Sequence, residues 1–223
     1  MRTVLASLLA PALLAAAQPA LAEVELSFYS GPQSAPHSDV TISGDSGVAD
    51  RDFTAGWEGH SFTAPIHAGA RLTWWRGGGD LGFGVEVNHA KIYADDETLE
   101  ETGLDRLEFT DGLNIVTANV MRRFPDALDG RLARVTPYVG GGLGVAVPHV
   151  EVYEGDARTF EYQLAGPAGA LMVGAQVALT ERWSVFGEYK ATYSVNEGDL
   201  DGGGTIETNV LTNALNVGVS YRF

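Results

Sequence analysis

Apolar residues occupy every second position at the end of the chain, at Leu215, Val217, Val219, Tyr221 and Phe223. Small or polar residues fill the positions between them. A period of two predicts a β-strand with one apolar face and one small or polar face. A closed barrel in lipid needs this division, with the apolar side chains outward and the polar ones toward the lumen.

The same alternation recurs along the chain and predicts eight strands. We expect them at residues 23–30, 66–75, 81–89, 108–124, 136–152, 159–179 and 183–196, with the last strand ending at residue 223. Connections after the second, fourth and sixth strands are mostly short, whereas those after the first, third and seventh are long and acidic. We therefore predict an all-β fold, an eight-stranded antiparallel transmembrane β-barrel with long acidic extracellular loops and periplasmic termini.

Residues 1–22 have the pattern of a secretory signal peptide. An apolar run at 4–17 follows Arg2, and Ala20 and Ala22 form a small-x-small cleavage site. The run is too short to be a membrane helix. We expect a single domain, the barrel, over residues 23–223 in the outer membrane of a Gram-negative bacterium. The terminal Phe resembles the signal that the barrel assembly machinery recognises.

The chain is strongly acidic, with a formal net charge of −15. This charge argues against a nucleic-acid partner. Acidic loops beside a phosphate-rich leaflet would need divalent cations as bridges or would bind a metal, or they simply keep the surface soluble. An eight-stranded barrel has its lumen filled by side chains, so solute transport is not expected.

All five histidines fall on the extracellular half of this predicted topology. They are His37, His60, His67, His89 and His149. Histidines and carboxylates on one rim would form a metal site, although solvated loop residues account for them equally well. Glu188 and Lys190 lie two positions apart on the seventh predicted strand and should face the lumen. There they would form a salt bridge that stabilises the barrel.

Several segments resemble the outer-membrane lipid A oxidase family, which forms 2-aminogluconate on lipid A. Two of them are FTAGWEGHSF at 53–62 and TPYVGGGLGVAVPHVEV at 136–152, and others are at 87–99, 107–114, 159–168 and 183–208. The wider group of opacity-type, OmpA-like surface barrels shares the fold. The resemblance implies oxidation of the proximal glucosamine at C1, with molecular oxygen as electron acceptor and lipid A, in lipopolysaccharide, as partner.

The matching segments contain the candidate site residues. The expected catalytic residues are Glu188, Lys190 and Glu161. The expected substrate-binding residues are Lys91, Asp95 and Asp96. The lysines would pair with a phosphate or carboxylate of the substrate as point charges.

The expected cofactor is a divalent redox metal held by His89 and His149 with Glu161 or Glu188 as the third ligand. The two histidines end strands that are separated by one strand, about 10 Å apart at a strand spacing of about 4.8 Å. Strict alternation points both rings outward, so a local bulge would be needed to turn them toward the lumen.

Two alternatives remain open. One is a non-enzymatic surface barrel of the opacity type, with a structural or adhesive role. The other is a different lipid A modifier, a deacylase or an acyltransferase, which would change acyl chains rather than add an oxygen.

Overall fold

The computed structural model describes residues 23–45 and 47–223, so the predicted signal peptide lies outside the described residues. The fold is all-β and antiparallel, as predicted, with thirteen described strands in one sheet. The wall strands are β1 (Glu23–Ser30), β6 (Ala68–Trp75), β7 (Leu81–Ala94), β8 (Arg106–Arg123), β9 (Val135–Glu154), β11 (Gly166–Ala178), β12 (Trp183–Asp199) and β13 (Thr205–Arg222).

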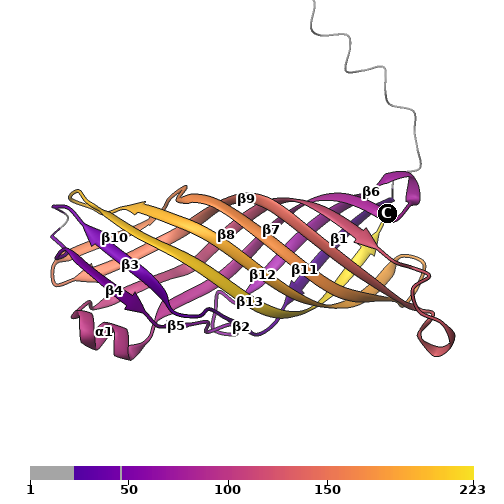
Figure 1. Cartoon of the computed structure of the whole chain (residues 1–223), viewed down its shortest axis with the longest axis horizontal. Coiled ribbons are helices and arrows are strands. Elements are labelled where there is room, and N and C mark those ends of the chain that lie inside the picture. Colours follow the sequence, from indigo (N-terminus) through magenta and orange to yellow (C-terminus); the bar gives the residue numbers. More distant parts are fainter. Residues whose placement is uncertain (1–22, 46) are drawn as a thin grey trace, which may run out of the picture.

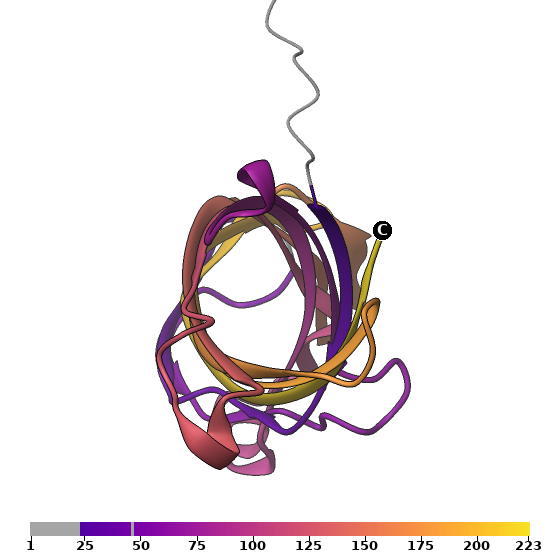
Figure 2. The same ribbon diagram turned by 90° about the vertical axis from the view of Figure 1, so that its right-hand side faces the viewer.

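The wall strands pair in a closed ring. Each is antiparallel to the next, and β1 closes on β13 with Phe28 opposite Val219. Figure 2 shows the ring from one end. The start of β1 and the end of β13 meet, since the amide of Phe223 donates to the carbonyl of Val24. We call this the terminal end, on the right in Figure 1, and the opposite end the far end.

Segments predicted as loops contain further structure at the far end (Figure 1). The short strands there are β3 (Ser38–Ser43), β4 (Arg51–Ala55), β5 (Trp57–Glu58) and β10 (Ala157–Tyr162), and the loop after β7 contains helix α1 (Asp96–Thr102). A further short strand, β2 (Gln33–Ser34), pairs with the middle of β13. The strand predicted at 159–179 is two strands, because β10 and β11 pair with different parts of β9. Within the described ranges, no helix has the length and apolar character needed to cross a membrane.

Along most of the wall the outward side chains are apolar and exposed. Leu143, Leu171 and Val217 are 70–80% exposed, whereas inward residues such as Asn119 and Thr192 are polar and buried. Aromatic rings cluster outside at the terminal end. They include the Trp74–Phe83 pair and the Trp183–Tyr221–Phe223 group. An apolar band bordered by aromatic residues is the surface that a barrel presents to lipid.

The two faces of the wall exchange character toward the far end. On β9 the outward residues change from Leu143 and Val145 to His149 and Glu151, while the inward residues become Val150 and Val152. β7 and β8 change in the same way. The far end therefore has an apolar core and a polar outside, as a water-soluble β-structure does.

Two glutamine side chains close gaps between strands at the far end. Gln33 donates to the carbonyl of Lys91 at 2.8 Å and accepts from its amide at 3.0 Å. Gln163 donates to the carbonyl of Asp199 at 2.8 Å and accepts from its amide at 2.6 Å. Each carboxamide makes the two bonds that a neighbouring strand would otherwise make.

Gln163→Ala should loosen the junction between β10 and β12. Two hydrogen bonds at about 0.5–1.5 kcal/mol each are lost, so the free energy of unfolding should fall by about 1–3 kcal/mol. Hydrogen exchange of the Asp199 amide should accelerate. Glu197→Ala, at an exposed site on β12, is the control, and equal exchange in both variants would contradict this role of Gln163.

Candidate functional site

The outward face of β7–β10 beyond the apolar band carries a continuous set of charged and aromatic residues. The last exposed apolar residues before it are Val87 on β7, Val116 on β8 and Val145 on β9. Strand pairing places Tyr93 beside Glu108, Glu108 beside Glu151, and His149 beside Tyr162. This face is where the wall would leave lipid and enter the layer of lipid headgroups.

Four of these residues lie in one chain of close polar contacts, which we call the Arg106 cluster: Arg106, Glu108, His149 and Glu151. Arg106 Nη1 lies 2.5 Å from Glu108 Oε1 and 3.0 Å from Glu151 Oε2. Glu151 Oε1 lies 3.2 Å from His149 Nδ1. A carboxylate therefore connects a guanidinium to an imidazole.

The cluster is protected on one side and accessible on the other. The side chain of Arg106 is 46% exposed, whereas those of His149 and Glu151 are buried. Burial opposes a charged Arg106, but Glu151 and Glu108 outweigh it and raise the Arg106 pKa. The rings of Phe160 and Tyr162 pack on His149, with centroids at 4.3 and 4.6 Å.

A second cation lies beside this cluster. The guanidinium carbons of Arg106 and Arg158 each lie 5.3 Å from the ring centroid of Tyr153. Both arginines are exposed. A chain with a net charge of −15 thus presents a local pair of arginines that can bind phosphate or carboxylate.

The histidines predicted as metal ligands both face outward. His89 Nδ1 lies 2.9 Å from Asn114 Oδ1, and His149 Nδ1 lies 3.2 Å from Glu151 Oε1 without making a hydrogen bond. The bulge in β7 lies between Ala90 and Ile92, which is after His89. It therefore does not turn the His89 ring inward. Among the residues that the structure describes, no group of three His, Asp or Glu side chains could hold a metal ion. The predicted ligand set is therefore not assembled.

Glu188 and Lys190 face the lumen, as alternation predicts, on the other side of the wall from His149. Glu188 Oε2 lies 2.9 Å from Arg71, and Lys190 Nζ lies 3.4 Å from Glu188 Oε1 and also contacts Glu86. Arg71 Nη1 lies 3.4 Å from Glu86. All four side chains are at most 4% exposed. Instead of an isolated pair, the lumen contains a closed network of two cations and two carboxylates.

This position keeps Glu188 and Lys190 away from a lipid headgroup, so the structure gives no support to their predicted catalytic role. Arg71 and Glu86 were missed as their partners. Both lie on the polar face of their own strands. Their alternation was visible in the sequence, but the register that brings them to Glu188 was not.

Glu161 and Lys91 also differ from the predicted arrangement. Glu161 is exposed on β10 and accepts a hydrogen bond from Gln163. Lys91 is buried, and its ammonium donates to the carbonyl of Thr63 at 2.7 Å. Burial lowers the Lys91 pKa, against the charges of Glu108 and Asp111. A substrate would reach Lys91 only after displacing the Thr63 segment, whereas Arg106 is already accessible.

Asp95 and Asp96 belong to the start of α1. Asp95 is the N-cap and accepts the amide hydrogen of Thr98 at 2.8 Å, and Asp96 lies in the first turn. Gly103 ends the helix with a φ of 75°, a conformation that favours glycine. Helix capping accounts for Asp95 without a substrate.

Asp95→Ala should destabilise α1 by about 1 kcal/mol, the usual cost of losing an N-cap. Hydrogen bonds from Thr98 hold the Asp95 pKa below its ordinary value. The stability that the cap contributes is thus fully present above the ordinary carboxyl pKa. It is lost as the pH falls through the lowered pKa of Asp95. Faster hydrogen exchange at Thr98 would report the loss. Asp96→Ala is the matched control, and an equal effect there would contradict the capping role.

Comparison with known proteins decides the family. A model described as the outer membrane protein β-barrel domain matches residues 7–223. The chain belongs to this family. The exposed apolar band of this outer-membrane barrel is then its lipid-facing surface, and the protein resides in the outer membrane of a Gram-negative bacterium. No curated protein sequence matches the chain.

Three solved structures that match the chain are distant from it in sequence. Neisserial surface protein A is 15% identical, with 91% of this chain and 97% of that one covered and a TM-score of 0.49. The N-terminal β-barrel domain of Pseudomonas aeruginosa OprF is 12% identical, with 90% and 97% covered and a TM-score of 0.42. Ail of Yersinia pestis, solved with a heparin analogue, is 12% identical, with 87% and 98% covered and a TM-score of 0.36.

Proposed function

We propose that this outer-membrane barrel is a lipid A oxidase that converts the proximal glucosamine of lipid A to 2-aminogluconate. The observation that carries the proposal is the position of the Arg106 cluster, on the outward face directly beyond the lipid-exposed band. A sugar headgroup whose acyl chains lie against the wall would meet Arg106 and Arg158 first. The resemblance of the sequence to lipid A oxidases supports the choice of reaction.

The proposal includes an orientation. The eight wall strands cross the outer membrane, the terminal end faces the periplasm, and the far end faces the medium. Lipopolysaccharide occupies the outer leaflet, so its headgroups would lie at the height of the Arg106 cluster. The barrel assembly machinery would recognise β13 during insertion.

The chemistry is a two-electron oxidation of a hemiacetal. His149 would take the proton of the C1 hydroxyl, with the Glu151 carboxylate 3.2 Å from its Nδ1 atom. Loss of that proton and of the C1 hydrogen with its electron pair gives a lactone, which water opens to the aldonate. Molecular oxygen accepts two electrons and two protons and becomes hydrogen peroxide. Arg106 would bind a phosphate of the substrate or the carboxylate of the product.

Side chains alone pass electrons to oxygen poorly, so the proposal retains a requirement for a divalent redox metal. The predicted ligand set does not fit the structure, and we route no step through a metal. Chelation of the purified barrel, followed by metal analysis and readdition, would test the requirement.

The test uses a host whose lipid A lacks the 1-phosphate, with and without this chain. Mass spectrometry of lipid A should show a product heavier by one oxygen, formed in air and absent without air. Unchanged lipid A in air, with the barrel folded in the outer membrane, would overturn the proposal. Gain or loss of an acyl chain would instead indicate an acyltransferase or a deacylase.

A non-enzymatic surface barrel is the second candidate function. The packed apolar core at the far end favours it, because such a core could hold loops rigidly for a structural or adhesive role. Unchanged lipid A together with impaired surface attachment in a deletion strain would support this function.

A further inference from the structure

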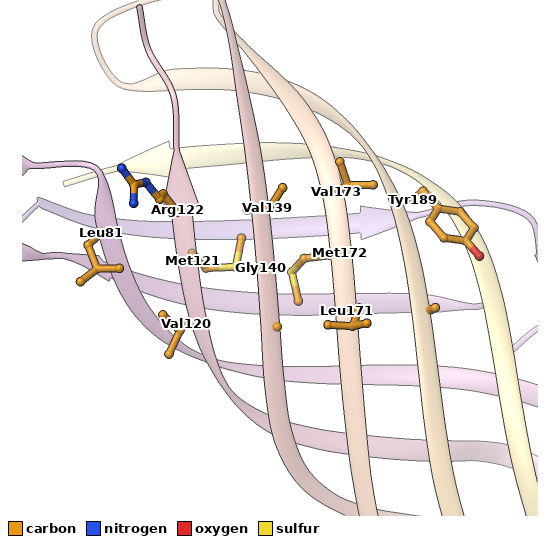
Figure 3. A pocket seen from close by; sticks show the side chains of 12 residues that line it. Leu81, Val120, Met121, Arg122, Val139, Gly140, Leu171, Met172, Val173 and Tyr189 are labelled. Carbon is orange, nitrogen blue, oxygen red and sulfur yellow. The ribbon is translucent and has the colours of Figure 1, made fainter. Parts of the chain in front are cut away.

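An apolar groove of about 660 Å³ crosses the outward face of β8, β9, β11 and β12 (Figure 3). Two small residues form its floor, Gly141 on β9 and Ala191 on β12. Strand pairing places Gly141 between Val120 and Leu171, and Leu171 between Gly141 and Ala191. The small residues thus alternate with large ones across the wall and leave hollows beside Leu171.

The row on the terminal side of this floor is bulky. Val139, Val173 and Tyr189 are paired side by side in the next row toward the terminal end. The hydroxyl of Tyr189 is already bound to Asn213 at 2.5 Å, so the ring presents its apolar surface to the groove. A second hollow of about 290 Å³, which shares Leu171 and Ala191, continues the groove toward the far end. The groove is therefore elongated and suits a flexible hydrocarbon chain.

A cation borders the groove at the terminal end. Arg122 on β8 pairs with Val139 on β9 and is exposed on the outward face. Its guanidinium carbon lies 5.5 Å from the ring centroid of Phe124, and Figure 3 shows it directed away from Val139. Within the part of the chain that the structure describes, Arg122 has no carboxylate partner. A long cationic side chain at the edge of a lipid-facing surface extends its head toward the phosphate layer.

We propose that this groove binds one glycerophospholipid, with an acyl chain along Gly141 and Ala191 and the phosphate on Arg122. Arginine pairs strongly with phosphate. Arg122 and Arg106 lie at opposite ends of β8, so this cation faces the leaflet away from the Arg106 cluster. The inference uses only the proposed orientation and holds whether or not the barrel oxidises lipid A.

The experiment compares lipid retention by the full barrel after extraction in mild detergent and reconstitution with phosphatidylglycerol or with lipid A. Native mass spectrometry should show one phosphatidylglycerol per wild-type chain. Gly141→Leu fills the groove, where an added Cβ would already lie 3.1 Å from Leu171 Cδ2, and should abolish the lipid-bound peak. Arg122→Gln should also lose it. Heat-modifiable migration in gels checks that each variant is folded.

The matched controls are Gly187→Leu, an outward site on β12 with open space around it, and Arg131→Gln in the turn after β8. Both should retain the lipid as wild type does. Equal retention by Gly141→Leu and Arg122→Gln would overturn the proposal. So would retention of lipid A in place of phosphatidylglycerol, loss of the lipid in the controls as well, or a dimer of the chain without lipid.

Discussion

Glu188→Ala is expected to destabilise the folded barrel by about 3–5 kcal/mol, the cost of breaking a buried ion pair by removing one partner. Glu188 accepts hydrogen bonds from Arg71 at 2.9 Å and from Tyr138 at 2.8 Å, and Lys190 lies 3.4 Å away. The variant would leave two buried cations facing Glu86 alone. The midpoint of urea unfolding in lipid vesicles, followed by tryptophan fluorescence, measures the loss.

Two further variants test whether charge balance causes this effect. Glu197→Ala removes an exposed carboxylate from the same strand and should be nearly neutral. The double variant Glu188→Ala with Arg71→Met removes one charge of each sign and should recover part of the lost stability. If Glu188→Ala unfolds at the wild-type midpoint, the lumen network does not stabilise the barrel.

Glu151→Gln is expected to lower the rate of lipid A oxidation by about 10²–10⁴-fold, the usual contribution of general acid–base catalysis. The neutral amide would no longer balance the positive charge that His149 gains when it takes the proton of the C1 hydroxyl. His149→Ala should have an effect of similar size. Quantitative mass spectrometry of the oxidised lipid A against time gives the rate, and heat-modifiable migration confirms folding.

Arg106→Gln separates binding from chemistry. It should weaken substrate binding more than turnover, because Arg106 is proposed to hold the charged group of lipid A. Glu97→Gln, at an exposed position in α1, is the matched control and should leave the rate unchanged. Wild-type rates in both Glu151→Gln and His149→Ala would exclude the Arg106 cluster as the site of oxidation.

The wall could be predicted well from the sequence because lipid imposes a strict alternation. The bounds of β1 agree with the predicted strand at 23–30, and β6 and β12 differ from prediction by a few residues. The helix at Asp96–Thr102 was missed although its signals were present, an Asp N-cap and a Gly after its last turn. The acidic composition of that loop obscured them.

The candidate site was harder to predict because a period of two does not give the environment that each face meets. At His149 and Glu151 the alternation continues unchanged while the environment of each face reverses. Strict alternation predicted the outward direction of the His149 ring correctly, but not its packing against Phe160 and Tyr162, which depends on the separation of β10 from β11. The network of Arg71, Glu86, Glu188 and Lys190 likewise requires the pairing of strands distant in sequence.

The exchange of character between the two faces of the wall also fixes how deep the barrel lies in the membrane. Displacement in the direction of the terminal end would pull Glu151 and Arg106 into hydrocarbon, and displacement in the opposite direction would expose Leu143 and Val145 to water. Both moves are costly, so a bilayer of different thickness would be met by tilting of the barrel or by thinning of the lipid. The Arg106 cluster is thereby held at constant height relative to the lipid headgroups, whatever the conformation of the loops beyond it.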